Sequence, residues 1–287
     1  MSVMFTEFGS RLPSPKVWAS LGDPTCLKPD GGIYKGPSGN PAFGFFDHFH
    51  SFQATSLEGP YLMLETDGDT TIEQINCTAT EKGLLAINMA SGTTEDETAI
   101  QWGRGLGAPF QLTGNDLAFE CRISISNITT ALFNIGVGLG DVGMGATTKF
   151  FTNSDILDSA ADFLGFVKLK GETTDFDGAY QDADGDYVDG AVKTKLNALA
   201  TFTASATTYH KLGFRYRAHP ETVEWYVDGV MSGVNGPAPA RLTAAECSVA
   251  DTFPDDVLLT PILACHNFAG STAIQVNMDW WACAQYL

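Results

Sequence analysis

The chain has 287 residues and a formal net charge of −18, and 44% of its residues are hydrophobic, which is ample material for a large core. It shows no basic cluster in sequence, so phosphate-bearing nucleic acids and anionic membrane surfaces are disfavoured as partners. No stretch approaches the about 20 apolar residues of a membrane-spanning helix, and residues 1–7 carry no secretion-signal pattern. We therefore expect synthesis in a cytoplasm and neither nucleic acid nor membrane as partner.

Residues 1–46 are rich in proline and glycine, which prevents a long helix or a central strand. Aromatic residues are interleaved with them, as a flexible polar linker would not require. We expect an extended N-terminal arm that lies on the sandwich itself, on a neighbouring copy or on a different protein. Its predicted partner-binding anchors are Trp18, Tyr34, Phe43, Phe45 and Phe46.

From residue 47 to residue 287 the sequence predicts one domain of about a dozen strands, because apolar and polar residues alternate with a period of two. The Asp228-Gly229 dipeptide predicts a hairpin turn. Glycines at 136, 138 and 140 indicate either a bulge or the close approach of another segment. The predicted strands are 61–65, 70–77, 83–89, 98–101, 117–126, 133–140, 163–169, 209–216, 223–227, 258–265 and 274–285.

Three other segments are less regular. Residues 150–158 carry a possible cap at 153 or 154 and are expected to form a short helix. Residues 172–189 are acidic and are expected to be rich in loops. Residues 192–202 are ambiguous between helix and strand, and we favour a strand. Together these features predict an all-β sandwich of two antiparallel sheets.

Six segments in one order carry a resemblance: LAFECRISI (117–125), FNIGVGLGD (133–141), FLGFV (163–167), YHKLGFRY (209–216), VEWYVDG (223–229) and VNMDWWACAQ (276–285). This succession resembles the concanavalin A-like lectin/glucanase jelly roll and, more narrowly, the concanavalin A-like proteins of tailed bacteriophages. The resemblance covers residues 46–287. It implies a concanavalin A-like jelly-roll β-sandwich that serves as a non-enzymatic virion structural protein.

Within that family the resemblance favours a capsid decoration (cement) protein on the outer capsid surface of the virion. Its implied partners are the major capsid protein, whose neighbouring subunits it would stabilise, and copies of itself in a homotrimer. A different hypothesis is a lectin-like phage protein that binds a host glycan, with Trp281 as the exposed residue that stacks on a sugar ring. Trp225 and Trp280 follow the apolar alternation and are expected in the core.

Glycan hydrolysis is the weaker alternative. The glucanases of this fold carry paired carboxylates in a Glu-x-Asp-x-x-Glu arrangement, so that two of them flank one glycosidic bond. Here Glu120 stands alone, Glu221 and Glu224 lie on opposite faces of a strand, and Asp279 has no second carboxylate two residues later. The sequence therefore predicts no catalytic residue.

Asp182, Asp184 and Asp186 are the best candidates for metal ligands, since alternating aspartates can offer oxygen atoms to Ca²⁺. The spacing does not fit an EF-hand loop, because its glycine and its final glutamate are missing at the required positions. We therefore interpret the segment as a solvated acidic turn, and we expect no cofactor.

Histidine and cysteine add no stronger site. His48 and His50 could ligate a metal from one face of a strand, but no third ligand presents itself. His210 could be grouped with Ser205 or Asp228, yet the sequence has no nucleophile elbow. The six cysteines form no CxxC pair, and we expect reduced, buried thiols.

Overall fold

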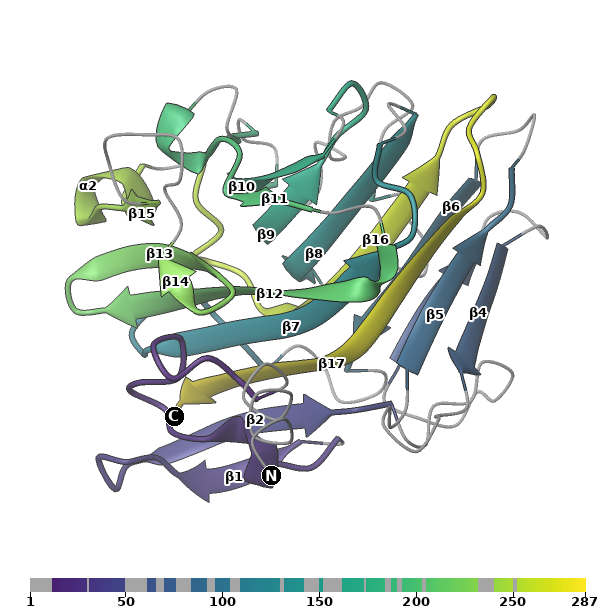
Figure 1. Cartoon of the computed structure of the whole chain (residues 1–287). Helices are drawn as coiled ribbons and strands as arrows, with labels where there is room; N and C mark the ends of the chain where they lie inside the picture. The colour runs from purple at the N-terminus through teal and green to yellow at the C-terminus, as the bar shows by residue number, and fades with distance from the viewer. Residues whose placement is uncertain are drawn as a thin grey trace, which may run out of the picture.

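Two antiparallel β-sheets pack face to face around one large apolar core (Figure 1). The computed structural model describes residues 12–29, 31–49, 61–65, 70–75, 84–91, 96–103, 109–129, 132–141, 150–151, 162–172, 174–183, 187–189, 193–202, 205–231, 240–249 and 252–287. The predicted all-β sandwich of two antiparallel sheets is therefore confirmed. Among the described residues, no helix has the length and apolar character needed to cross a bilayer.

The ten-stranded sheet contains, in spatial order, β1 (Gly32–Lys35), β2 (Pro41–Asp47), β17 (Ile274–Tyr286), β7 (Leu117–Ile125), β12 (Ser205–Ala218), β13 (Glu221–Val227) and β14 (Val230–Met231). Its remaining strands are β15 (Arg241–Leu242) beside β13, β5 (Leu84–Met89) beside β17, and β4 (Thr70–Ile75) beside β5. The seven-stranded sheet runs β11 (Ala200–Thr201), β10 (Asp175–Gln181), β9 (Phe163–Lys168), β8 (Phe133–Asp141), β16 (Leu259–Asn267), β6 (Asp96–Trp102) and β3 (Tyr61–Glu65). Short helical turns are η1 (Pro24–Cys26), η2 (Thr194–Leu196) and α2 (Ala244–Cys247).

Alternation along the strands explains which face each residue takes. On β8, Phe133, Ile135, Val137 and Leu139 enter the core, and the intervening glycines face outward. Gly138 is required by crowding, because a Cβ atom there would lie 2.2 Å from the backbone oxygen of the neighbouring β9 strand. At Gly136 a Cβ atom would lie 2.4 Å from the ring of Phe150, so the predicted close approach is confirmed at Gly136 and Gly138. The predicted Asp-Gly turn is also present, with φ values of +50° and +76° at its two residues.

Some sequence predictions about individual elements were wrong. Residues 175–181, expected within a loop-rich stretch, form β10, whose apolar side chains Phe176 and Tyr180 enter the core. Most of 192–202 is not a strand: η2 is followed only by the two-residue strand β11. Of the predicted helix at 150–158, the structure describes residues 150 and 151, which are not helical.

The N-terminal arm lies on its own sandwich, which is one of the three surfaces considered from the sequence. The predicted role of its aromatic anchors in binding a partner is corrected accordingly, because they pack within this chain. Trp18 is 3% exposed, and Phe45 is fully buried and stacks on Trp102 at a centroid distance of 4.3 Å. Tyr34 donates its hydroxyl to the carbonyl oxygen of Leu21, also within the chain. Phe43 is partly buried and packs against the core.

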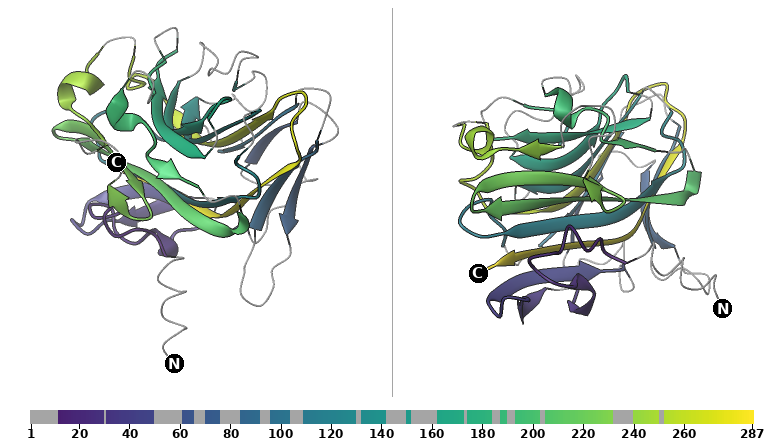
Figure 2. Two further views of the ribbon diagram at one scale, coloured as in Figure 1. Left: turned by 45° about the horizontal axis from the view of Figure 1, so that its top comes forward. Right: turned by 60° about the vertical axis from the view of Figure 1, so that its left-hand side comes forward.

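Two arrangements account for this correction. β2 (Pro41–Asp47) is hydrogen-bonded to β17 and spans the predicted boundary at residues 46 and 47, so residues from 32 onward belong to the sheet. The preceding residues 12–29, which we call the strap, lie across the outer face of the ten-stranded sheet (Figure 2). The apolar side chains of the strap are buried against its own chain, and this burial can order the strap without a second protein.

Trp281 is fully buried in the main core, so its predicted exposure is wrong. The pairing of β17 with β7 shifts register between Met278 and Trp280. A bulge of this kind reverses the inward and outward faces of every residue after it. Trp281 consequently points into the core, and Trp280 lies on the outer face, where the strap buries it. Trp225 is in the core as expected.

Candidate functional site

Acidic side chains converge at one end of the seven-stranded sheet. Asp162 directly precedes β9, Asp182 directly follows β10, and Asp256 lies shortly before β16. β9 is antiparallel to β8 and β10, and β16 is antiparallel to β8. The start of β9, the end of β10 and the start of β16 therefore lie at the same end of the sheet. One carboxylate oxygen from each aspartate lies within 4.8 Å of the other two. We call these three residues the acidic cluster.

The environment of the acidic cluster favours a positively charged or hydrogen-donating ligand. Burial raises the pKa of Asp162 to about 6; the backbone N–H of Ala183 opposes this rise, and the charges of Asp141, Asp182 and Asp256 add to it. Three carboxylate groups offer oxygen atoms within 4.8 Å of one another. Ca²⁺ takes carboxylate oxygens at about 2.3–2.6 Å, so oxygens this close together could share one such ion.

The sequence identified only one member of the acidic cluster. Asp182 was a predicted metal ligand, whereas Asp184 and Asp186 lie outside the described residues. Its partners in the structure, Asp162 and Asp256, are remote in sequence and become neighbours only through the strand order. A usable signal was present, because each of the three stands at or near the end of an apolar strand.

A second polar group lies on the outer face of the seven-stranded sheet. His266 on β16 is opposite both Glu97 on β6 and Asn134 on β8, and all three are at most 1% exposed. Glu97 accepts the backbone N–H of Phe150 at 2.5 Å, and its other oxygen lies 3.5 Å from His266 Nδ1. The ring of Phe268 stacks on the imidazole at 4.3 Å. This polar row is sealed from solvent, so it is not an open binding site.

A small hollow of about 190 Å³ lies between β11 and the β13–β14 hairpin. His210 and Asp228 line it, and His210 Nδ1 lies 2.9 Å from Asp228 Oδ2. Of the residues that the sequence analysis grouped with His210, Asp228 therefore does form a pair with it. Ser205 is not its third member, because its hydroxyl bonds to that of Thr207 at 3.1 Å. Within the described part of the chain, no hydroxyl nucleophile is hydrogen-bonded to His210.

The remaining carboxylates named from the sequence serve the fold. Glu120 Oε2 accepts the backbone N–H of Ser14 at 2.8 Å and the indole N–H of Trp18 at 2.9 Å, which fastens the strap. Asp279 pairs with Arg122. Of the two candidate histidines, His48 packs edge-on against the ring of Phe46, and His50 lies outside the described residues.

No protein-family model and no curated protein matches the chain. Solved structures do match it. The carbohydrate recognition domain of Emp47p has a TM-score of 0.53 at 7% identity, with 84% of this chain and 95% of that chain covered. The potassium-bound carbohydrate recognition domain of Emp46p has a TM-score of 0.51 at 9% identity, covering 83% and 94%.

An endo-β-1,3-glucanase from Pyrococcus furiosus is also similar, with a TM-score of 0.50, 12% identity, and coverage of 89% of this chain and 98% of the glucanase. Such low identities establish shared architecture and not shared activity. The agreement extends over nearly the whole length of the compared domains. The chain therefore has the jelly-roll fold of the concanavalin A-like lectins and glucanases.

Proposed function

We propose that this chain is a carbohydrate-binding protein of the lectin type, and that it binds saccharide at the acidic end of the seven-stranded sheet. The observation that carries the proposal is the agreement of fold with the carbohydrate recognition domains of Emp47p and Emp46p over 84% and 83% of the chain. Because one fold serves several functions, the proposal also needs a site with suitable chemistry.

The acidic cluster supplies that chemistry. Saccharide hydroxyls both donate and accept hydrogen bonds, and an ionised carboxylate is a strong acceptor for them. Asp182 is half-buried and Asp256 is exposed, so both can meet a ligand, while Asp162 is buried behind them. A Ca²⁺ ion held by the same oxygens would supply additional coordination to hydroxyl groups.

Binding without cleavage is favoured by the positions of the carboxylates. Glycoside hydrolysis uses two carboxyl groups that flank one bond, about 5–10 Å apart. The three aspartates instead crowd around a single point, and Glu97 is buried with its oxygens directed at Phe150 and His266. Since a glucanase is among the similar structures, the experiment must also measure cleavage.

The capsid decoration role remains a prediction from the sequence. It came from the family resemblance and in part from an arm expected to contact other subunits, and the arm anchors Trp18 and Phe45 are buried within this chain. Neither the fold nor the compared structures supports a virion location, a capsid partner or a homotrimer. Carbohydrate binding, the alternative considered from the sequence, is therefore the function we put forward.

The proposal is tested by calorimetric titration of the full chain with oligosaccharides selected on a glycan array. Asp182→Asn/Asp256→Asn should weaken binding by about tenfold or more, because two charge-assisted acceptors are lost. The control Asp23→Asn/Asp175→Asn removes two aspartates elsewhere, at the cap of η1 and at the opposite end of β10, and should bind normally.

Two further readouts separate the alternatives. Loss of binding on addition of a chelator, with recovery on adding Ca²⁺, would identify a cation in the acidic cluster. Release of shorter saccharides from the oligosaccharide would show that the chain is a glycan hydrolase and not only a binding protein. Equal affinity of the Asp182→Asn/Asp256→Asn variant and the unsubstituted chain would refute the location of the site.

A further inference from the structure

Three arginines gather on the outer face of the ten-stranded sheet, although the sequence shows no basic cluster. Arg215 on β12 lies opposite Glu224 on β13, and Glu224 lies opposite Arg241 on β15. Arg217 is two residues beyond Arg215 on the same strand, so it projects from the same face. Half of the six arginines in the chain thus surround one carboxylate.

Among the described contacts, only one of these arginines, Arg215, makes hydrogen bonds through its guanidinium group. Arg215 donates to Glu224 Oε2 at 2.5 Å, and Tyr226 donates its hydroxyl to the same oxygen at 2.8 Å. The Nε atoms of Arg217 and Arg241 lie 3.9 Å and 4.0 Å from the carboxylate, beyond hydrogen-bond distance. Glu224 therefore bonds one guanidinium directly and shares its single negative charge with two further guanidinium groups at the limit of ion-pair distance.

Arg217 and Arg241 are also open to solvent. Their side chains are 42% and 40% exposed, against 8% for Arg215. Asp116, in the same corner of the sheet, uses its Oδ1 to accept the backbone N–H of Ala218 at 3.1 Å. Across the described residues, no closer ion pair or hydrogen bond to Arg217 or Arg241 is present.

The neighbouring arginines and Tyr226 favour the ionised form of Glu224. Burial alone would raise its pKa, but hydrogen bonds from Arg215 and Tyr226 and the charges of Arg215 and Arg217 bring the pKa below its ordinary value. The carboxylate is ionised at neutral pH and holds Arg215 in place. Glu224 thereby holds a fixed position between the two outward-facing guanidinium groups of Arg217 on β12 and Arg241 on β15.

We propose that Arg217 and Arg241 form a binding site for an oxyanion, namely the carboxylate or sulfate group of a ligand. A guanidinium presents its N–H donors in a planar fork that matches the two oxygens of such a group. The chain has a net charge of −18, and here two exposed guanidinium groups flank one carboxylate. The site lies on the face opposite the seven-stranded sheet, away from the acidic cluster.

Two sources could supply the oxyanion, a free inorganic anion or an acidic saccharide. Only the second rests on the proposed carbohydrate-binding function. Calorimetric titration of the full chain at low ionic strength should therefore use sodium sulfate in one arm and a galacturonic acid trisaccharide in the other. We expect affinity for at least one probe to fall by about tenfold or more in Arg217→Gln/Arg241→Gln, since charge-assisted contacts are lost.

The matched control is Lys28→Gln/Lys35→Gln, which removes the same charge from two exposed lysines near the N-terminus. It should bind as the unsubstituted chain does. Arg217→Lys/Arg241→Lys keeps the charge and removes the fork, so it should bind more weakly if the contact is bidentate. Unfolding midpoints of all variants show whether each one is folded.

The outcomes distinguish this inference from the proposed function. An equal decrease of affinity in Arg217→Gln/Arg241→Gln and in the control Lys28→Gln/Lys35→Gln overturns the arginine site. No decrease of affinity in either variant overturns it as well. Acidic saccharide binding that is lost in Asp182→Asn/Asp256→Asn but kept in Arg217→Gln/Arg241→Gln also overturns it, when sulfate affinity is unchanged in Arg217→Gln/Arg241→Gln as well. Arginine-dependent binding of sulfate without any saccharide binding confirms the anion site and counts against the lectin proposal.

Discussion

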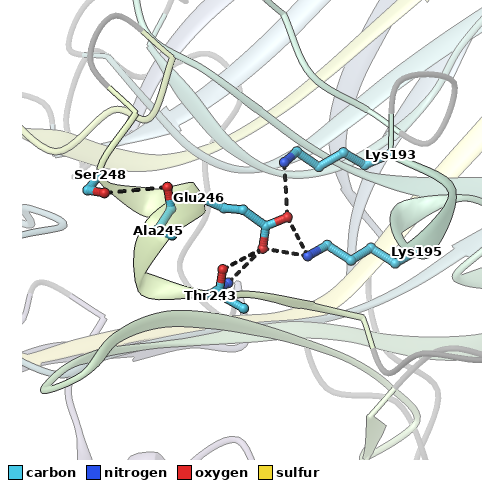
Figure 3. Close-up of polar contacts among 6 residues, drawn as sticks. All are labelled: Lys193, Lys195, Thr243, Ala245, Glu246 and Ser248. Atoms are coloured by element: carbon cyan, nitrogen blue, oxygen red, sulfur yellow. Dashed lines mark hydrogen bonds and ion pairs between the residues drawn. The ribbon is translucent and has the colours of Figure 1, made fainter.

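Glu246 joins the α2 turn to the segment that contains η2, and its removal should lower stability in a pH-dependent way (Figure 3). Its carboxylate lies 3.1 Å from Lys193 Nζ and 2.5 Å from Lys195 Nζ. It also accepts the backbone N–H of Thr243 at 2.8 Å and the hydroxyl of the same residue at 2.9 Å. Two elements distant in sequence are therefore held by one ionised group.

The size of the effect follows from the pKa of Glu246. Burial would raise this pKa, but hydrogen bonds from Lys195, Thr243 and Lys193 lower it from 4.5 to about 2. At about 1.4 kcal/mol for each pKa unit this corresponds to about 3 kcal/mol at most. The side chain is 25% exposed, so solvent screening reduces the expected contribution to roughly 1–2 kcal/mol.

The direction in which stability changes with pH follows from the direction in which folding shifts the pKa of Glu246. Because the folded-state pKa lies below the unfolded value, the stabilisation is present above pH 4.5 and is lost as the pH falls toward 2. Urea unfolding of Glu246→Gln should therefore show a loss of roughly 1–2 kcal/mol at pH 7 and a much smaller loss at pH 2.5. Glu221→Gln on β13 makes the same chemical change and serves as control.

A stability difference between Glu246→Gln and the unsubstituted chain that stays constant from pH 7 to pH 2.5 would contradict a stabilising role for the ionised carboxylate. It would mean that the glutamine lost packing or a neutral hydrogen bond and not an ion pair. A loss of the same size in Glu221→Gln would show that any glutamate in this region has the effect.

Three further predictions concern the strap, the sheet and the thiols. Trp18→Ala should destabilise the chain by about 3 kcal/mol in urea unfolding, and a loss below about 1 kcal/mol would show that the strap contributes little. Gly138→Ala should lower the thermal midpoint sharply, since its Cβ would lie 2.2 Å from a backbone oxygen of β9; an unchanged midpoint contradicts the crowding. Cys121, Cys265 and Cys283 are fully buried, and burial raises their thiol pKa values, so mass spectrometry should find them unlabelled by a thiol reagent until denaturant is added.

The strands were predictable where one rule decided the pattern. On β7 and β13 the apolar residues face the main core and the polar residues face outward, so alternation alone gave the right face. β10 was missed because its acidic residues suggested a loop, although Phe176 and Tyr180 carry the required period of two. Burial of those two rings outweighs the low strand propensity of aspartate.

Trp281 shows where alternation fails. The period of two was continued along β17, but the extra residue between Met278 and Trp280 exchanged the two faces. A bulge is imposed by the neighbouring strand and leaves no clear mark in the sequence. The strap illustrates the same limit, because its aromatic residues indicated contact but could not indicate with which surface.

The candidate sites depended on strand order more than on local motifs. Asp182 lies beside Asp162 and Asp256 only because β10 ends where β9 and β16 begin, at the same end of the seven-stranded sheet. Arg217 approaches Glu224 because β12 pairs with β13, and Arg241 approaches it because β15 pairs with β13. Neither group has a spacing that a motif search would detect, since their members come from separate strands.

The most direct test of the central claim is a glycan-array measurement on the folded full-length chain, with Asp182→Asn/Asp256→Asn on a parallel array. A restricted set of oligosaccharides should bind the unsubstituted chain, and their signal should be lost in the variant. A folded chain that binds no oligosaccharide on the array would contradict the lectin-type function.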